Sequence, residues 1–142
     1  MKKELFPIRD IDRKVYEEEL APFLPEKIID THTHVWLKKF KFAEPEGKKR
    51  AVTWPALVAE DNPIEDLLET YNLMFPDKTV TPLIFTSITR ADDGEAQNKY
   101  IEDSARKFNV PSLLYAFPEW EADDLLTRIT RGAKLTTITT CK

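Results

Sequence analysis

The sequence predicts an α/β fold in which parallel strands alternate with helices. Three runs rich in apolar and β-branched residues, at 28–36, 79–89 and 112–117, are separated by segments whose apolar residues recur at helical spacing. Strands that alternate with helices are typical of right-handed β-α-β units, which build a parallel sheet. Because 142 residues suit one ordinary domain, we expect a single domain over residues 1–142.

A short helix is expected before the first strand. Asp12 is placed to cap a helix over residues 13–20, and the prolines that follow end it. Three apolar residues share one face of this helix at helical spacing: Tyr16, Leu20 and Phe23. The first strand then covers Ile28 to Trp36.

Residues 37–61 are expected to form a long loop after the first strand, because they carry mixed charge, two prolines and a glycine. Such a loop in a compact domain is often a lid or a binding loop, and disorder is the alternative. The next helix begins with Asn62 as its cap and Pro63 as its first residue. Its apolar face is long and regular: Ile64, Leu67, Leu68, Tyr71, Met74 and Phe75.

The second half of the chain repeats the alternation. Pro82 lies within the run 79–89, so we expect that strand to begin near Leu83. A helix capped in the Asp-Asp-Gly stretch 92–94 follows. The strand 112–117, a helix over 119–131 with Gly132 as its C-cap, and a tail with strand propensity complete the order.

The composition excludes several classes of function. A formal net charge of -4 without a basic stripe argues against binding to nucleic acid or to an anionic membrane. No apolar run is long enough to span a membrane, and the N-terminus lacks the apolar region of a signal peptide. The single cysteine, Cys141, cannot form an internal disulfide, which favours a reducing compartment. We therefore expect a cytoplasmic protein.

The stretch KIIDTHTHVW, residues 27–36, contains both histidines of the chain. Side chains alternate along a strand, so His32 and His34 should point together, with Asp30 behind them and Trp36 ahead on the same face. Two imidazoles and a carboxylate on one face of a buried sheet are costly, and a divalent cation would offset that cost. A hydrogen-bonded pair or a solvated edge pair is the alternative.

This stretch resembles the first-strand signature of the amidohydrolase superfamily, in which a short apolar run leads into Asp-x-His-x-His. The matching residues are Asp30, His32 and His34. The resemblance implies the N-terminal half of a TIM (β/α)8 barrel. It also implies that His32 and His34 bind zinc or a similar divalent metal, with Asp30 as a ligand or an orienting residue. The implied reaction is attack of metal-activated water on an amide, lactone or related carbon. Some relatives are decarboxylases, which is the alternative reaction.

The chain departs from that family in its length. A full barrel needs about 250 residues, whereas this sequence ends near the fourth strand and holds no third histidine. We therefore expect a truncated or frame-shifted product. Such a half-barrel would pair with a missing C-terminal half, form a homo-oligomer, or remain a loose collapsed state. The remaining alternative is an inactive half-barrel that acts only as a dimer or interaction module.

The predicted contacts with a small-molecule substrate are Trp36, which lies ahead of the histidines, and Arg90, which follows the second strand.

Overall fold

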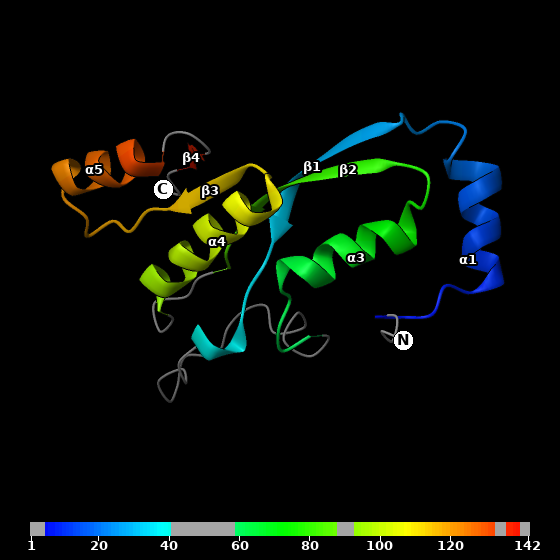
Figure 1. Ribbon diagram of the computed structural model, residues 1–142, viewed down its shortest axis with the longest axis horizontal. Coiled ribbons are helices and arrows are strands. Elements are labelled where there is room, and N and C mark those ends of the chain that lie inside the picture. Colours follow the sequence, from blue (N-terminus) through cyan, green and yellow to red (C-terminus); the bar gives the residue numbers. More distant parts are fainter. Residues whose placement is uncertain (1–4, 41–58, 88–92, 133–135, 140–142) are drawn as a thin grey trace.

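The computed structural model describes four stretches of the chain, residues 5–40, 59–87, 93–132 and 136–139 (Figure 1). Within them, four strands form one open sheet in the order β1-β2-β3-β4, and every neighbouring pair is parallel. The strands are β1 (Lys27–His34), β2 (Thr79–Phe85), β3 (Ser112–Tyr115) and β4 (Thr136–Thr139). The predicted fold of parallel β/α units is confirmed.

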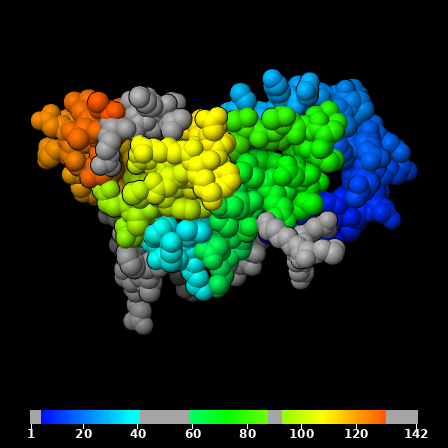
Figure 2. Space-filling view, in the orientation of Figure 1, coloured from blue at the N-terminus to red at the C-terminus, as the bar shows by residue number. Residues whose placement is uncertain are grey.

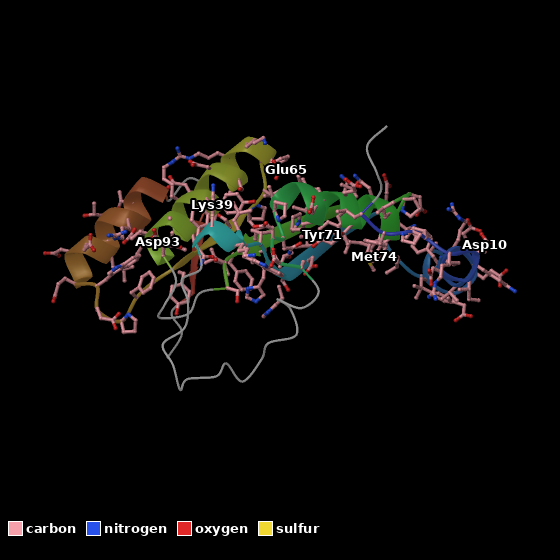
Figure 3. All side chains as sticks on the ribbon, turned by 90° about the horizontal axis from the view of Figure 1, so that it is seen from below. Asp10, Lys39, Glu65, Tyr71, Met74 and Asp93 are labelled. Atoms are coloured by element: carbon pink, nitrogen blue, oxygen red, sulfur yellow. The ribbon has the colours of Figure 1, made fainter. Side chains whose placement is uncertain are left out.

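Three helices connect these strands: α3 (Ile64–Met74), α4 (Gly94–Phe108) and α5 (Ala122–Gly132). Helices α3 and α4 lie along the same face of the sheet, and the core forms between them and β1 and β2 (Figure 3). Its buried members are Val35, Ile64, Leu67, Tyr71, Ile84, Ile101, Ala105 and Val110. We call this side the helix face. In the described part of the chain no helix covers the other side, where Ile29 is 70% exposed, and we call that side the open face.

The N-terminal helix is less regular than its sequence suggests. Helix α1 (Asp10–Val15) continues as a π-helical turn, η1 (Tyr16–Leu20). The prediction of Asp12 as the cap is wrong, because Arg9 precedes the helix and donates its backbone N–H to the Asp12 carboxylate at 3.1 Å. The wider π turn also shifts later residues off the helical repeat. Tyr16 is buried, but Phe23 is 85% exposed, so the predicted shared face is wrong.

Strand β2 begins at Thr79, four residues before the predicted start at Leu83, and it contains Pro82. The backbone N–H of Ile84 points towards β3 and donates to the carbonyl of Pro111 at 3.0 Å. The nitrogen of Pro82, two residues earlier, points to the same side at a level where β3 has not yet begun. The proline therefore removes no hydrogen bond from the sheet, and its side chain is buried.

The helix starts follow the sequence in part. Asp93 caps α4 as predicted, since its carboxylate accepts the N–H of Ala96 at 3.0 Å. Asn62 does not cap α3, because Pro63 holds the cap position and Asn62 instead forms a bridge with Trp36. Helix α5 starts at Ala122 rather than 119, and Gly132 is its last residue rather than its cap.

The long segment after β1 begins with a short 3-10 helix, η2 (Lys38–Phe40). The end of η2 packs against α4. The carbonyl of Phe40 accepts the N–H of Asp93 at 2.8 Å, and the centroid of the Phe40 ring lies 6.1 Å from that of Tyr100. The rest of the predicted loop, residues 41–58, lies outside the described residues. The prediction of a long loop over residues 37–61 therefore stays a prediction.

The molecule is elongated, with the N-terminal residues at one end beside α3 and with α5 at the other end (Figure 2). None of the helices in the described stretches combines the length and the apolar character that crossing a membrane requires.

Candidate metal site

The two histidines lie side by side at the carboxyl end of β1. Their ring centroids are 5.1 Å apart, with the ring planes at 70°. Both rings contact Phe85 at the end of β2, at centroid distances of 5.2 Å for His32 and 4.3 Å for His34. The two imidazoles therefore point together, as their spacing on a strand predicts, and they do so where the carboxyl ends of parallel strands meet.

A bulge separates Asp30 from the histidines. In the pairing of β1 with β2, Asp30 lies opposite Pro82 and Thr33 lies opposite Ile84, so β1 has one extra residue between these points. Thr31 and His32 are both exposed, whereas Thr33 is buried. The extra residue breaks the alternation of faces. The prediction that Asp30 shares a face with His32 and His34 is therefore wrong.

The carboxylate of Asp30 instead faces α3. One oxygen accepts the backbone N–H of His32 at 3.1 Å, and the other accepts the hydroxyl of Tyr71 at 2.8 Å. Burial by itself would raise the pKa of Asp30, but hydrogen bonds from His32, Tyr71 and Thr33 outweigh it and hold that pKa below its usual value. One oxygen is thus bonded to the backbone of β1 and the other to α3, and the role of Asp30 as a metal ligand or an orienting residue stays a prediction.

His34 is held by the end of β2. Its Nδ1 lies 3.3 Å from the carbonyl oxygen of Thr86. A carbonyl can only accept, so Nδ1 carries the proton and Nε2 keeps its lone pair. Burial lowers the pKa of His34, the charge of His32 lowers it further, and the Thr86 contact opposes both. A neutral imidazole with Nε2 available is the form that binds metals.

The backbone around His34 is anchored as well. The carbonyl of His34 accepts the side-chain amide of Asn62 at 2.8 Å, and the next residue, Val35, donates its N–H to the carbonyl of Phe85 at 3.0 Å. Behind the site, the Thr86 hydroxyl donates to the side-chain carbonyl of Gln97 on α4. Gln97 is 1% exposed, and its amide nitrogen has no partner among the described residues.

Comparison with known proteins identifies no family for this chain. No family model, curated protein or solved structure matches the chain.

The predicted substrate contacts are placed only in part. Trp36 follows the histidines, its indole N–H donates to the carbonyl of Glu60 at 3.2 Å, and its backbone pairs with Asn62. These bonds hold the tryptophan next to the site, and its contact with a substrate stays a prediction. Arg90 lies outside the described residues.

The donor set of the site fits part of a metal centre. Two imidazoles suit zinc, which in catalytic sites takes three protein ligands and a water. Within the described stretches no group of three or more His, Cys, Asp or Glu side chains is placed to hold an ion. The two histidines would therefore supply at most two ligands of such a centre.

Several residues of this site are not evident from the sequence. Tyr71 belongs to the regular apolar face of α3, which marks it as a core residue, and Gln97 lies in a polar stretch of α4. Only Phe85 and Thr86 could have been assigned to the site from the sequence, because they lie at the end of the second apolar strand. Residues at that level of a parallel sheet lie beside the end of the first strand.

Proposed function

We propose that this chain supplies the first β/α units of a metal-dependent hydrolase of the amidohydrolase type, in which His32 and His34 bind a divalent cation, zinc by preference. The observation that carries the proposal is the pair of imidazoles at the carboxyl end of β1, with centroids 5.1 Å apart. The contact of His34 Nδ1 with the Thr86 carbonyl supports it, because it leaves Nε2 available.

The position of the pair in the fold supports the same proposal. Parallel β/α folds carry their chemistry at the carboxyl ends of the strands. Helices α3 and α4 cover one face, and the histidines lie on the open face, which in a closed barrel would be the interior. We therefore propose that β1 to β4 form half of a (β/α)8 barrel, whose remaining strands come from further chain or a second copy.

A bound divalent ion would supply a water of lowered pKa and would polarise a substrate carbonyl. The residues of this chain would hold that ion and fix its surroundings. His34 enters as a neutral ligand, and Phe85 packs against both rings and limits their rotation. The substrate class that follows is a small molecule with an amide, a lactone or a related carbonyl carbon.

Zinc binding by the purified chain tests the assignment of the ligands. Metal-free protein is titrated with Zn²⁺ by calorimetry, and the parent is compared with the His32→Ala, His34→Ala double variant. Thr31→Ala is the matched control, since Thr31 is an exposed residue of the same strand. We expect the parent and the control to bind zinc alike and the double variant to lose binding. Equal zinc binding by the double variant would refute the assignment.

A non-catalytic role has one observation in its favour, which is the exposed apolar surface on the open face. Ile29 is 70% exposed there, and β1 is an edge strand of the sheet. Under this alternative the chain is a half-barrel that pairs with a second copy. Gel filtration with and without zinc separates the two, because a dimer that is indifferent to zinc favours the interaction role.

A further inference from the structure

We infer that Asp30 is a positioning residue that turns both histidines onto the open face by holding the β1 bulge. The inference concerns the site of the proposed function and deepens it. It depends on that function only for the role of the metal, since the placement of the rings is a property of the chain alone.

The alternation of side chains along a strand fixes which residues share a face. In a regular strand, residues separated by an even number share a face, so Asp30, His32 and His34 would all point the same way. The Asp30 carboxylate lies on the helix face, bound to Tyr71 of α3. Without the extra residue, the two imidazoles would therefore be directed into the helix face.

Thr33 shows that the parity has changed. It is three residues from Asp30, an odd number, yet both side chains meet the hydroxyl of Tyr71. The Thr33 hydroxyl also donates to the backbone carbonyl of Asp30 at 3.4 Å. The register with β2 locates the change between Asp30 and Thr33. A one-residue change of register moves every later side chain to the opposite face.

Asp30 holds the bulge with both oxygens of one carboxylate. In the bulge, His32 has no partner in the register with β2, and its N–H donates to Asp30 at 3.1 Å. A bond of this kind, from the backbone N–H of residue i+2 to the side chain of residue i, closes a local turn. Asp and Asn favour this turn, which competes with regular pairing of the strand. The second oxygen accepts the Tyr71 hydroxyl and ties the turn to α3. The carboxylate therefore links the bulge to the core.

Nuclear magnetic resonance of the metal-free protein tests this inference. The parent should show cross-peaks between both histidine rings and the Phe85 ring, as the centroid distances require. In Asp30→Ala, we expect these cross-peaks to be lost. In Asp30→Asn, we expect them to remain, because the side-chain carbonyl can still accept the His32 N–H. Full retention of the cross-peaks in Asp30→Ala would overturn the inference.

Deletion of Thr31 supplies a second and independent variant. It removes the extra residue, so the strand becomes regular while Asp30 stays on the helix face and the histidines stay on the open face. Deletion of Thr31 in the Asp30→Ala background should therefore restore the cross-peaks to Phe85. We expect the same result even if Asp30→Ala alone does not fold. If the double variant shows no cross-peaks or remains unfolded, Asp30 has another role and the inference fails.

Zinc titration of the same variants separates the inference from the proposed function. We expect Asp30→Ala to bind zinc at least tenfold more weakly than the parent, and deletion of Thr31 to restore the affinity. Absence of zinc binding in a parent that keeps its cross-peaks would refute the proposed function alone. Unchanged zinc affinity and unchanged cross-peaks in Asp30→Ala would refute the inference alone.

Discussion

Asp30 of β1 accepts a hydrogen bond of 2.8 Å from the hydroxyl of Tyr71 in α3, and this bond shifts the pKa values of its two groups in opposite directions. Burial, together with the Asp30 charge, raises the pKa of Tyr71 to about 12. The hydrogen bonds on Asp30 hold its pKa below the usual value. The hydrogen bond between a charged Asp30 and a neutral Tyr71 is thus present throughout the neutral pH range.

The first prediction concerns stability against pH. Because the folded pKa of Asp30 is lowered, its contribution is present above about pH 4, the unfolded value, and is lost as the pH falls through the folded pKa. The folded pKa of Tyr71 is raised, so its contribution is present below about pH 10 and is lost as the pH rises to about 12. Tyr71→Phe should lower the free energy of unfolding near pH 7 by about 1.5–3 kcal/mol.

Urea denaturation at a series of pH values measures this effect. Tyr100→Phe is the matched control, because the Tyr100 hydroxyl accepts the backbone N–H of Ile64 and meets no carboxylate in the contacts described. We expect the Tyr71→Phe profile to be flatter than that of the parent at both extremes and the Tyr100→Phe profile to keep its shape. Parallel profiles for all three proteins would contradict the role of the pair.

The second prediction concerns the core between the sheet and its helices. Ile84 is 0% exposed on β2 and packs among residues of α3 and α4. Ile84→Ala should lower the free energy of unfolding by about 2–5 kcal/mol, since it leaves a cavity. Leu126→Ala, at a position 58% exposed, should change it by less than about 0.5 kcal/mol. Thermal or urea unfolding compares them, and equal losses would mean that the core lies elsewhere.

Much of the fold follows from local periodicity. Helices α3 and α4 bury Leu67, Tyr71, Ile101 and Ala105, which recur at helical spacing, and such a pattern depends only on near neighbours along the chain. The pairing of His32 with His34 on one face is local for the same reason. The parallel arrangement of the strands followed from the alternation of these elements.

The bulge could not be predicted in this way. It depends on a bond between Asp30 and Tyr71, which are 41 residues apart in the chain, and on the register with β2. The start of β2 was missed for a similar reason, because Pro82 is tolerated only where β3 has not yet begun. Each of these errors comes from a tertiary contact that overrides a local rule.

The third prediction concerns the support of the candidate site. Phe85 packs against both imidazoles, so Phe85→Ala should allow the rings to rotate and weaken zinc binding about tenfold, as loss of outer supports does in other metal sites. Leu83→Ala is the control, because Leu83 lies two residues earlier on the same strand. Calorimetric titration with Zn²⁺ measures both. Equal affinity for zinc in the parent and Phe85→Ala would show that the phenyl ring gives no support.

The fourth prediction concerns the cap of α4. The Asp93 carboxylate accepts the N–H of Ala96 at 3.0 Å. Asp93→Ala should lower the free energy of unfolding by about 1 kcal/mol, and Asp93→Ser should lower it by only a few tenths, because serine also caps. Urea unfolding of the three proteins gives the comparison. A loss of the same size in both variants would mean that the charge of Asp93, rather than its cap bond, carries the effect.

The fifth prediction concerns Gly94, the first residue of α4. A Cβ atom at this position would overlap the ring of Phe117, which packs between Tyr115 and Trp120 at centroid distances of 5.0 and 5.2 Å. Helix propensity alone favours Gly94→Ala, but the displaced ring should make this variant less stable by about 1–3 kcal/mol. Phe117→Leu in the same background should recover part of the loss, which a double-mutant cycle by urea unfolding measures. A more stable Gly94→Ala protein would show that the ring moves aside at no cost.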